Sequence, residues 1–257
     1  MNNITFMGSL FNCADARAWA RGGVAMLLLA MPFVGGCATP TTSYYSKPFG
    51  GQVVDAVTGK PMEGVNVLAY WDMEHAESGH GAGTLTQEEA VTDADGRFEI
   101  PGWGPLQIQR SDGAWVRINP TAPGVKAFKP GYEFGRQFVS TNANKNGGDM
   151  GMATLGLPFN GGPSVREAKL DGPIKMKLFP RSEKEYFSLL QYDVVAMHDC
   201  LWTKAPRFIA AIIKEQRRGE TQFPDKVWHS PFYYLMHDDP RFAKCGSYAQ
   251  IVGPYLK

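Results

Sequence analysis

"GQVVDAVTGKPMEGVNVLAYW", residues 51–71, and "VTDADGRFEI", residues 91–100, carry most of the information about the fold. Both stretches hold short runs rich in β-branched and aromatic residues. In the first, a Thr-Gly-Lys-Pro sequence at residues 58–61 separates two such runs. In the second, Asp95-Gly96 precedes one, and this dipeptide tolerates the positive φ angles that tight hairpins need. The sequence therefore predicts short β-strands joined by tight turns.

The chain beyond these stretches continues the same pattern. Six or more short strands with turn signals between them are typical of a β-sandwich. Two segments interrupt the pattern and are expected to be loops, namely 72–89 and the glycine-rich 141–163. The further strand candidates, which Gly and Pro separate, are "WVRIN" (115–119), "VKAF" (125–128), "RQFVS" (136–140) and "PIKMKLF" (173–179).

The order of these elements resembles the carboxypeptidase regulatory-like domain family. Three segments carry the resemblance, residues 51–67, 92–98 and 129–132. It implies a mainly β fold, a transthyretin-like (prealbumin-like) β-sandwich of about seven strands over residues 49–181. Within it, the glycines are expected to set the turns and Phe98 to point into the core. The resemblance says almost nothing about activity, because function depends on the sites that a fold carries.

From Ser182 onward the pattern changes to the three- and four-residue spacing of an amphipathic helix. Ser182 and Glu185 form a capping-box signature at its start. A second helix is expected to begin at Pro206 and to end at Gly219. Residues 182–257 are therefore predicted to form a small helical appendage that packs on the sandwich. Two more helix starts are expected, at Ser230-Pro231 and Asp239-Pro240.

The N-terminus has the features of an exported lipoprotein. Basic residues precede an apolar run at residues 24–37, which has the length of a signal-peptide core and is shorter than a usual membrane span. The run ends in Val34–Cys37, which resembles the lipobox of bacterial lipoproteins. That resemblance implies cleavage before Cys37 and lipidation of its thiol. Residues 1–36 are therefore predicted to be a signal peptide, and residues 37–48 a tether.

The lipobox resemblance also implies a location. Acyl chains on Cys37 would anchor the protein to a membrane. Ala38, where an aspartate would retain an enteric lipoprotein in the inner membrane, favours the outer membrane, with the folded part facing the periplasm. In that oxidising compartment Cys200, on the first helix, and Cys245, on the last, are expected to form a disulfide. Two buried free thiols are the alternative.

Composition and motif spacing argue against several functions. The formal net charge is only +1, which gives no overall attraction to nucleic acid, so no nucleic-acid partner is expected. The sequence contains no His-x-x-Glu or His-Glu-x-x-His zinc motif, no His-x-His pair like that of the intradiol dioxygenases, and no Gly-x-Ser-x-Gly elbow. The sequence therefore predicts no catalytic residues and no cofactor.

Two clusters of histidine and acidic residues remain as candidates for a metal site. One lies in "EHAESGH" and the other in "MHDDPR". If His75, His80, His237 and Asp238 met in space, they would offer the nitrogen and oxygen ligands that divalent metals bind. A metal-dependent hydrolase acting on envelope polymers is the corresponding hypothesis. The competing interpretation is a solvated polar loop and a helix cap by Asp239.

Aromatic residues are concentrated in the predicted appendage. Trp202, Trp228, Tyr233 and Tyr234 would form an exposed surface that stacks on a sugar or receives a protein, if they do not instead fill the interface with the sandwich. The function that the sequence favours is a membrane-tethered, non-catalytic periplasmic module. Its expected partner is a protein or glycan of the cell envelope.

Overall fold

The computed structural model describes residues 43–108, 116–138, 140–143, 164–190, 195–225, 230, 232–237 and 239–257. The chain divides into two compact units, residues 1–39 and Pro40–Lys257, and all described residues belong to the second. The predicted signal peptide, the lipobox with Cys37, and the candidate site residues Trp228 and Asp238 lie outside the described residues. Among the described helices, none combines the length and apolar character needed to cross a membrane.

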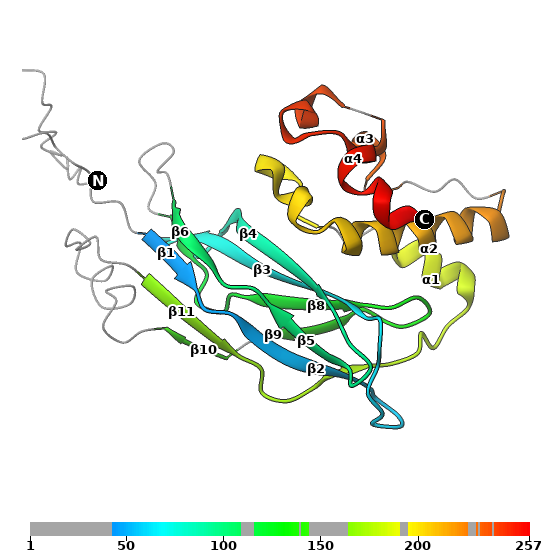
Figure 1. Ribbon diagram of the computed structural model, residues 1–257, viewed down its shortest axis with the longest axis horizontal. Coiled ribbons are helices and arrows are strands. Elements are labelled where there is room, and N and C mark those ends of the chain that lie inside the picture. Colours follow the sequence, from blue (N-terminus) through cyan, green and yellow to red (C-terminus); the bar gives the residue numbers. More distant parts are fainter. Residues whose placement is uncertain are drawn as a thin grey trace, which may run out of the picture. The chain divides into compact units, whose positions relative to one another are not determined.

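The described part of the chain is mainly β, as the sequence predicts, and Figure 1 shows its strands beside a group of helices. The strands form sheets with the orders β10-β11-β1-β6, β12-β2-β5 and β4-β3-β8-β9, and β7 pairs with β3. Their bounds are β1 Ser43–Ser46, β2 Phe49–Asp55, β3 Asn66–His75, β4 Gly81–Val91, β5 Arg97–Ile100, β6 Trp103–Gln107, β7 Val116–Ile118, β8 Gly124–Phe128, β9 Gly135–Phe138, β10 Ser140–Ala143, β11 Ser164–Lys169 and β12 Ile174–Met176.

The tight turns form where the glycines predict them. Gly59 and Gly96 adopt φ angles of 67° and 69°, which L-residues with a side chain rarely reach. At Gly96 an added Cβ would also lie 2.5 Å from the backbone oxygen of Val53, so glycine is required there. The strands that flank each turn lie in different sheets, because β2 pairs with β5 and β12 whereas β3 pairs with β4, β7 and β8. Each turn thus carries the chain from one layer to the other.

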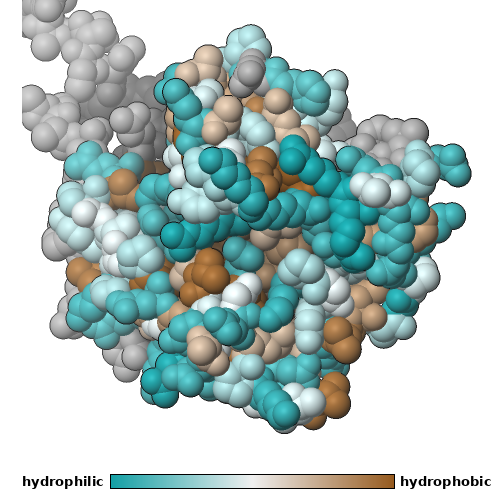
Figure 2. All heavy atoms as spheres, turned by 45° about the vertical axis from the view of Figure 1, so that its right-hand side comes forward, coloured by the Kyte–Doolittle hydropathy of each residue, from teal (hydrophilic) through white to brown (hydrophobic). Residues whose placement is uncertain are grey.

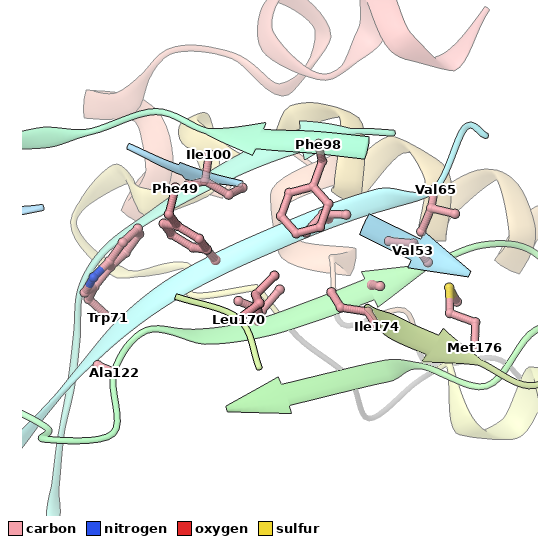
Figure 3. Packing of buried hydrophobic residues seen from close by; sticks show 14 of the residues in the cluster. Phe49, Val53, Val65, Trp71, Phe98, Ile100, Ala122, Leu170, Ile174 and Met176 are labelled. Carbon is pink, nitrogen blue, oxygen red and sulfur yellow. The ribbon is translucent and has the colours of Figure 1, made fainter. Parts of the chain in front are cut away.

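The sheets pack face to face through one cluster of buried side chains, which gives an open sandwich. Figure 3 shows residues of β2, β5 and β12 together with Trp71 of β3 in this core. Phe98 is only 6% exposed, which confirms its predicted inward orientation. It packs over Gly51, where an added Cβ would lie 2.9 Å from the ring of Phe98 and 2.2 Å from Leu170. Trp71 contacts the ring of Phe49 edge-on, with the centroids 6.3 Å apart.

Three predicted non-strand segments contain strands. The predicted loop 141–163 begins inside β10, which covers Ser140–Ala143 and pairs with β11. β1 lies inside residues 37–48, the predicted tether, and it pairs with β6 and β11. The predicted loop 72–89 is a hairpin instead, since β3 continues to His75 and β4 begins at Gly81. β4 is rich in Thr, Gln and Glu, and these polar residues contact the helical appendage. Its sequence therefore lacks the apolar pattern of an ordinary strand.

The helical part begins with the predicted capping box, in which Ser182 and Glu185 exchange hydrogen bonds. Pro206 opens α2 as predicted, but α2 continues through Gly219 to Gln222. Gly219 does not end the helix; it gives room to the ring of Phe187, which would lie 2.7 Å from an added Cβ. The helix bounds are α1 Glu183–Leu189, η3 His198–Lys204, α2 Pro206–Gln222, α3 Tyr233–Met236, η4 Pro240–Cys245, α4 Tyr248–Ile251 and η5 Gly253–Leu256.

The helical appendage packs on the outer face of the sandwich, as predicted. A second cluster of buried side chains joins Leu68 of β3 and Phe128 of β8 to Phe208 and its neighbours on α2. Polar contacts fix the same interface: the side chain of Gln87 on β4 accepts from the backbone N–H of Ala196 and donates to the carbonyl of Leu201. The appendage is therefore held to the sheet by both apolar and hydrogen-bonded contacts.

Candidate functional site

The exposed aromatic residues predicted from the sequence are found on α3. Tyr233 and Tyr234 are 53% and 57% exposed. Their ring centroids lie 5.6 Å apart and the ring planes meet at 85°, an edge-on arrangement. The ring of His237 stacks on Tyr233 with the centroids 4.1 Å apart, and its Nδ1 lies 2.7 Å from the carbonyl oxygen of Tyr233. Each tyrosine thus has a fixed neighbour, although more than half of its surface meets solvent.

An arginine that the sequence analysis did not identify lies over Tyr234. The guanidinium of Arg241 lies 4.8 Å from the ring centroid of Tyr234. Asp239 holds it there through two hydrogen bonds of 2.9 Å, from Nε to Oδ1 and from Nη2 to Oδ2. The same carboxylate accepts the backbone N–H of Arg241 and so caps η4, which confirms the predicted cap.

This bidentate pair also keeps both groups charged. Hydrogen bonding to Arg241 lowers the pKa of Asp239 from its ordinary value. The hydrogen bond to Asp239 raises the pKa of Arg241 in turn. The bidentate contact with Asp239 orients the planar cation over Tyr234, an arrangement that suits protein interfaces.

A pocket of about 260 Å³ lies beside Asp239. Most of its lining is apolar. The hydroxyl of Tyr248 is buried without a hydrogen-bond partner, and desolvation raises the pKa of this group while the charge of Arg217 opposes the rise. The lining residues are Leu235, Asp239, Phe242, Ala243, Gly246, Ser247 and Tyr248.

The predicted disulfide holds this region to the sandwich. Cys200 and Cys245 are bonded, with their Cα atoms 5.2 Å apart. They lie on η3 and η4, not on the first and last helices as the sequence suggested, because α1 ends at Leu189 and two helices follow η4. Since η3 is itself hydrogen-bonded to β4 through Gln87, the disulfide connects η4 and the pocket to a fixed point on the sheet.

A second pocket, of about 290 Å³, lies where η3 meets the sheet. His198 reaches across it, and its Nε2 lies 2.9 Å from the carbonyl oxygen of Thr84. A carbonyl oxygen only accepts, so Nε2 is the donor in this contact. His198 therefore positions η3 on β4. The lining residues are Leu68, Tyr70, Asp72, Thr84, Gln87, Lys126, Val195, Ala196 and His198.

The candidate metal residues are not brought into one group. Within the described ranges no three or more His, Cys, Asp or Glu side chains lie together so that they could hold a metal ion. His75 ends β3 and His80 precedes β4, with the backbone N–H of His75 donating to the carbonyl of His80. The neighbouring Glu74 is buried and pairs with Arg117 at 2.7 Å. His237 stacks on Tyr233 instead.

The prediction that Trp202 belongs to an exposed aromatic surface is wrong. Trp202 is 0% exposed and belongs to the buried cluster between the appendage and the sheet. Its size makes it suitable for filling this interface, so the alternative interpretation holds for this residue. The exposed surface consists of Tyr233, Tyr234, His237 and Arg241 with the pocket beside Asp239, and we call it the tyrosine surface.

Comparisons of the chain with known proteins do not show which family it belongs to. No protein-family model matches the chain, and no curated protein matches it. Among solved structures, the major plantain pollen allergen Pla l 1 is similar at 11% sequence identity, over 55% of this chain and 97% of that chain, with a TM-score of 0.22. A TM-score this low carries no argument about fold or function.

Proposed function

We propose that the protein is a non-catalytic binding module of the bacterial cell envelope that recognises a protein partner through the tyrosine surface. The observation that carries this proposal is the pair Tyr233 and Tyr234, each more than half exposed on a short helix. Single exposed apolar residues are common on protein surfaces, but aromatic side chains that lie together at the surface are typical of interaction sites. Tyr and Arg together are the residue types that contribute most to protein–protein binding energy.

The ring geometry favours a protein over a glycan. A sugar ring that stacks on an aromatic side chain needs an open ring face. Tyr233 and Tyr234 meet at 85°, His237 covers one face of the first ring, and Arg241 lies over the second. The pocket beside Asp239 is mostly apolar and has the volume of one large side chain. An apolar centre with a charged rim resembles the anatomy of a small protein interface.

The hydropathy of this side of the molecule is consistent with a compact contact. Figure 2, in which the helical side of the molecule is turned forward, shows small hydrophobic areas separated by hydrophilic residues. A broad continuous apolar area would instead suggest an obligate interface. A partner that binds reversibly through a few anchor residues therefore matches this face best.

The location is part of the proposal. The basic residues, the apolar run and the Val34–Cys37 lipobox support export and lipidation of Cys37. Ala38 supports sorting to the outer membrane, with the sandwich in the periplasm. The Cys200–Cys245 disulfide agrees with an oxidising compartment. Incorporation of radiolabelled palmitate into the wild type, and its loss in Cys37→Ala, tests this part.

We further propose that the sandwich has the transthyretin-like topology of carboxypeptidase regulatory-like domains. Its support is the position of β2, β3 and β5 in the matching segments, with left-handed glycines at the expected turns. An experimentally determined structure with a different strand order would exclude this topology.

The partner proposal is tested by photo-crosslinking in intact cells. A photoreactive amino acid replaces Tyr234, and in a matched control it replaces Tyr255, which is 39% exposed and also lies near an arginine, Arg207. We expect a discrete protease-sensitive adduct from position 234 that is lost in Arg241→Glu, and none from position 255. An adduct that only glycan-degrading enzymes remove would show that the partner is a glycan and not a protein. Absence of any adduct at position 234 would contradict the binding role of this surface.

A further inference from the structure

The start of β1 limits how far the sandwich can be from a lipid anchor. The inference rests on the proposed lipidation of Cys37. Ser43, the first residue of β1, comes six residues after Cys37. A fully extended chain spans at most about 3.6 Å per residue, so Ser43 would lie no more than about 22 Å from the anchored cysteine. The predicted tether covered residues 37–48, but β1 occupies Ser43–Ser46. Only the residues between Cys37 and Ser43 are therefore left to connect the sandwich to the anchor.

The strand pairing identifies which end of the molecule this is. Ser43 pairs with Gln107, the last residue of β6, and Tyr44 pairs with Ser164, the first residue of β11. Three chain segments thus begin or end together at one end of this sheet, which we call the anchor end. After β1 the chain continues in the same direction through β2, as Figure 1 shows, and reaches the turn that holds Val57.

The length of this path sets the separation of the two ends. Residues 43–55 form β1, β2 and their short connection. At about 3.3 Å per strand residue this path spans roughly 40 Å. Val57 at the far end of this path is 86% exposed. Gln107, which pairs with Ser43 at the anchor end, is exposed as well.

We infer that the protein sits on the membrane with its anchor end, at Ser43, Gln107 and Ser164, facing the lipid surface and the Val57 turn directed away from it. The short connection between Cys37 and Ser43 holds the anchor end near the bilayer. Removal of residues 1–36 takes away two basic residues and one acidic residue, so the mature net charge is (26−2)−(25−1) = 0. A neutral chain has no overall attraction to anionic lipid that would pull the long side of the sandwich flat against the surface.

Energy transfer to labelled lipids tests the orientation. The full lipidated protein, purified from membranes, is reconstituted in phosphatidylethanolamine–phosphatidylglycerol vesicles that carry a headgroup acceptor. A donor is attached at Gln107→Cys or, as the matched variant, at Val57→Cys; the native Cys200–Cys245 pair is oxidised and does not react. We expect transfer from position 107 to exceed that from position 57 by about twofold or more, because roughly 40 Å separates the two ends.

The outcomes separate the orientation from the anchor. Equal transfer from the two positions, or stronger transfer from position 57, would overturn the orientation even when palmitate labelling confirms the anchor. The mature chain with Cys37→Ala, produced without residues 1–36 and so without the apolar run and Cys13, should show no transfer from either position, and transfer that persists in it would show that the acyl anchor does not set the orientation. A wild type that incorporates no palmitate would overturn the proposed anchor and the orientation together.

Discussion

Glu89 of β4 caps the N-terminus of α2 at Phe208, more than a hundred residues further along the chain. Its Oε2 accepts the backbone N–H of Phe208 at 2.8 Å, and its Oε1 accepts that of Arg207 at 3.0 Å. The residue in the N-cap position itself, Ala205, makes no side-chain hydrogen bond. A helix leaves its first N–H groups without partners in its own turn, so the sheet supplies the missing acceptors. This carboxylate therefore links the position of the helical appendage to the sandwich.

Substitution of Glu89 should destabilise the protein. Glu89→Ala removes both acceptors from the start of α2, and the loss of a helix cap costs about 1–2 kcal/mol. We expect a lower denaturation midpoint with an unchanged denaturant dependence, measured by circular dichroism. Glu99→Ala, on an exposed position of β5, is the matched control and should change the midpoint little. Equal effects of the two substitutions would contradict the capping role.

The stability contributed by Glu89 should also depend on pH. Burial raises the pKa of Glu89 above its ordinary value of 4.5, although the N–H groups of Phe208 and Arg207 act in the opposite direction. A raised pKa in the folded state means that folding favours the protonated form. This contribution is present in full below the unfolded pKa and is lost as the pH rises through the folded pKa.

The measurement compares the wild type with Glu89→Gln, which cannot ionise. The free energy of unfolding of the wild type, relative to that of the variant, should decrease as the pH rises from below 4.5 through the raised pKa. Glu88 raises the same pKa through its charge, so Glu88→Gln should shift the decrease to lower pH. A difference that stays constant with pH would contradict the assigned pKa direction.

The same contact explains which parts of the fold the sequence predicts. Turns at Gly59 and Gly96, the capping box at Ser182 and the start of α2 at Pro206 depend on neighbouring residues, and the structure confirms them. β4 was missed because its polar residues serve a partner distant in sequence. Gln87 and Glu89 look like solvent-exposed residues until the appendage covers them. A pattern of polar and apolar residues cannot contain this information.

The residues of the candidate site also differ in whether the sequence alone could predict their role. Tyr233 and Tyr234 were identified because aromatic residues are concentrated in residues 182–257, and the structure shows that these two are exposed. Trp202 was wrongly included because composition does not distinguish a buried tryptophan from an exposed one. Arg241 was missed because its role depends on the orientation that Asp239 imposes on it, which only the three-dimensional arrangement shows.

Removal of the disulfide should destabilise the whole appendage. Cys200 and Cys245 are 45 residues apart, and a loop of this length contributes about 4 kcal/mol in the chain-entropy model. We expect Cys200→Ser/Cys245→Ser to lower the free energy of unfolding by about 3–4 kcal/mol, measured by urea denaturation. A reductant should lower the stability of the wild type similarly and leave the double variant unchanged. Two reactive thiols in the denatured, non-reduced wild type would contradict the disulfide.

Gly219→Ala tests how closely α1 and α2 pack. In an exposed helix interior this substitution would stabilise by about 1 kcal/mol, because alanine is the better helix former. Here the new Cβ would lie 2.7 Å from the ring of Phe187, whose position is fixed in the buried cluster. Overpacking of this kind costs about 1–3 kcal/mol, so we expect a net loss of stability in thermal unfolding. Gly253→Ala is the control, since an added Cβ there meets nothing within 4 Å, and it should be neutral or slightly stabilising. If Gly219→Ala raised the melting temperature as much as Gly253→Ala, α1 would not pack against α2 as closely as the distance to Phe187 requires.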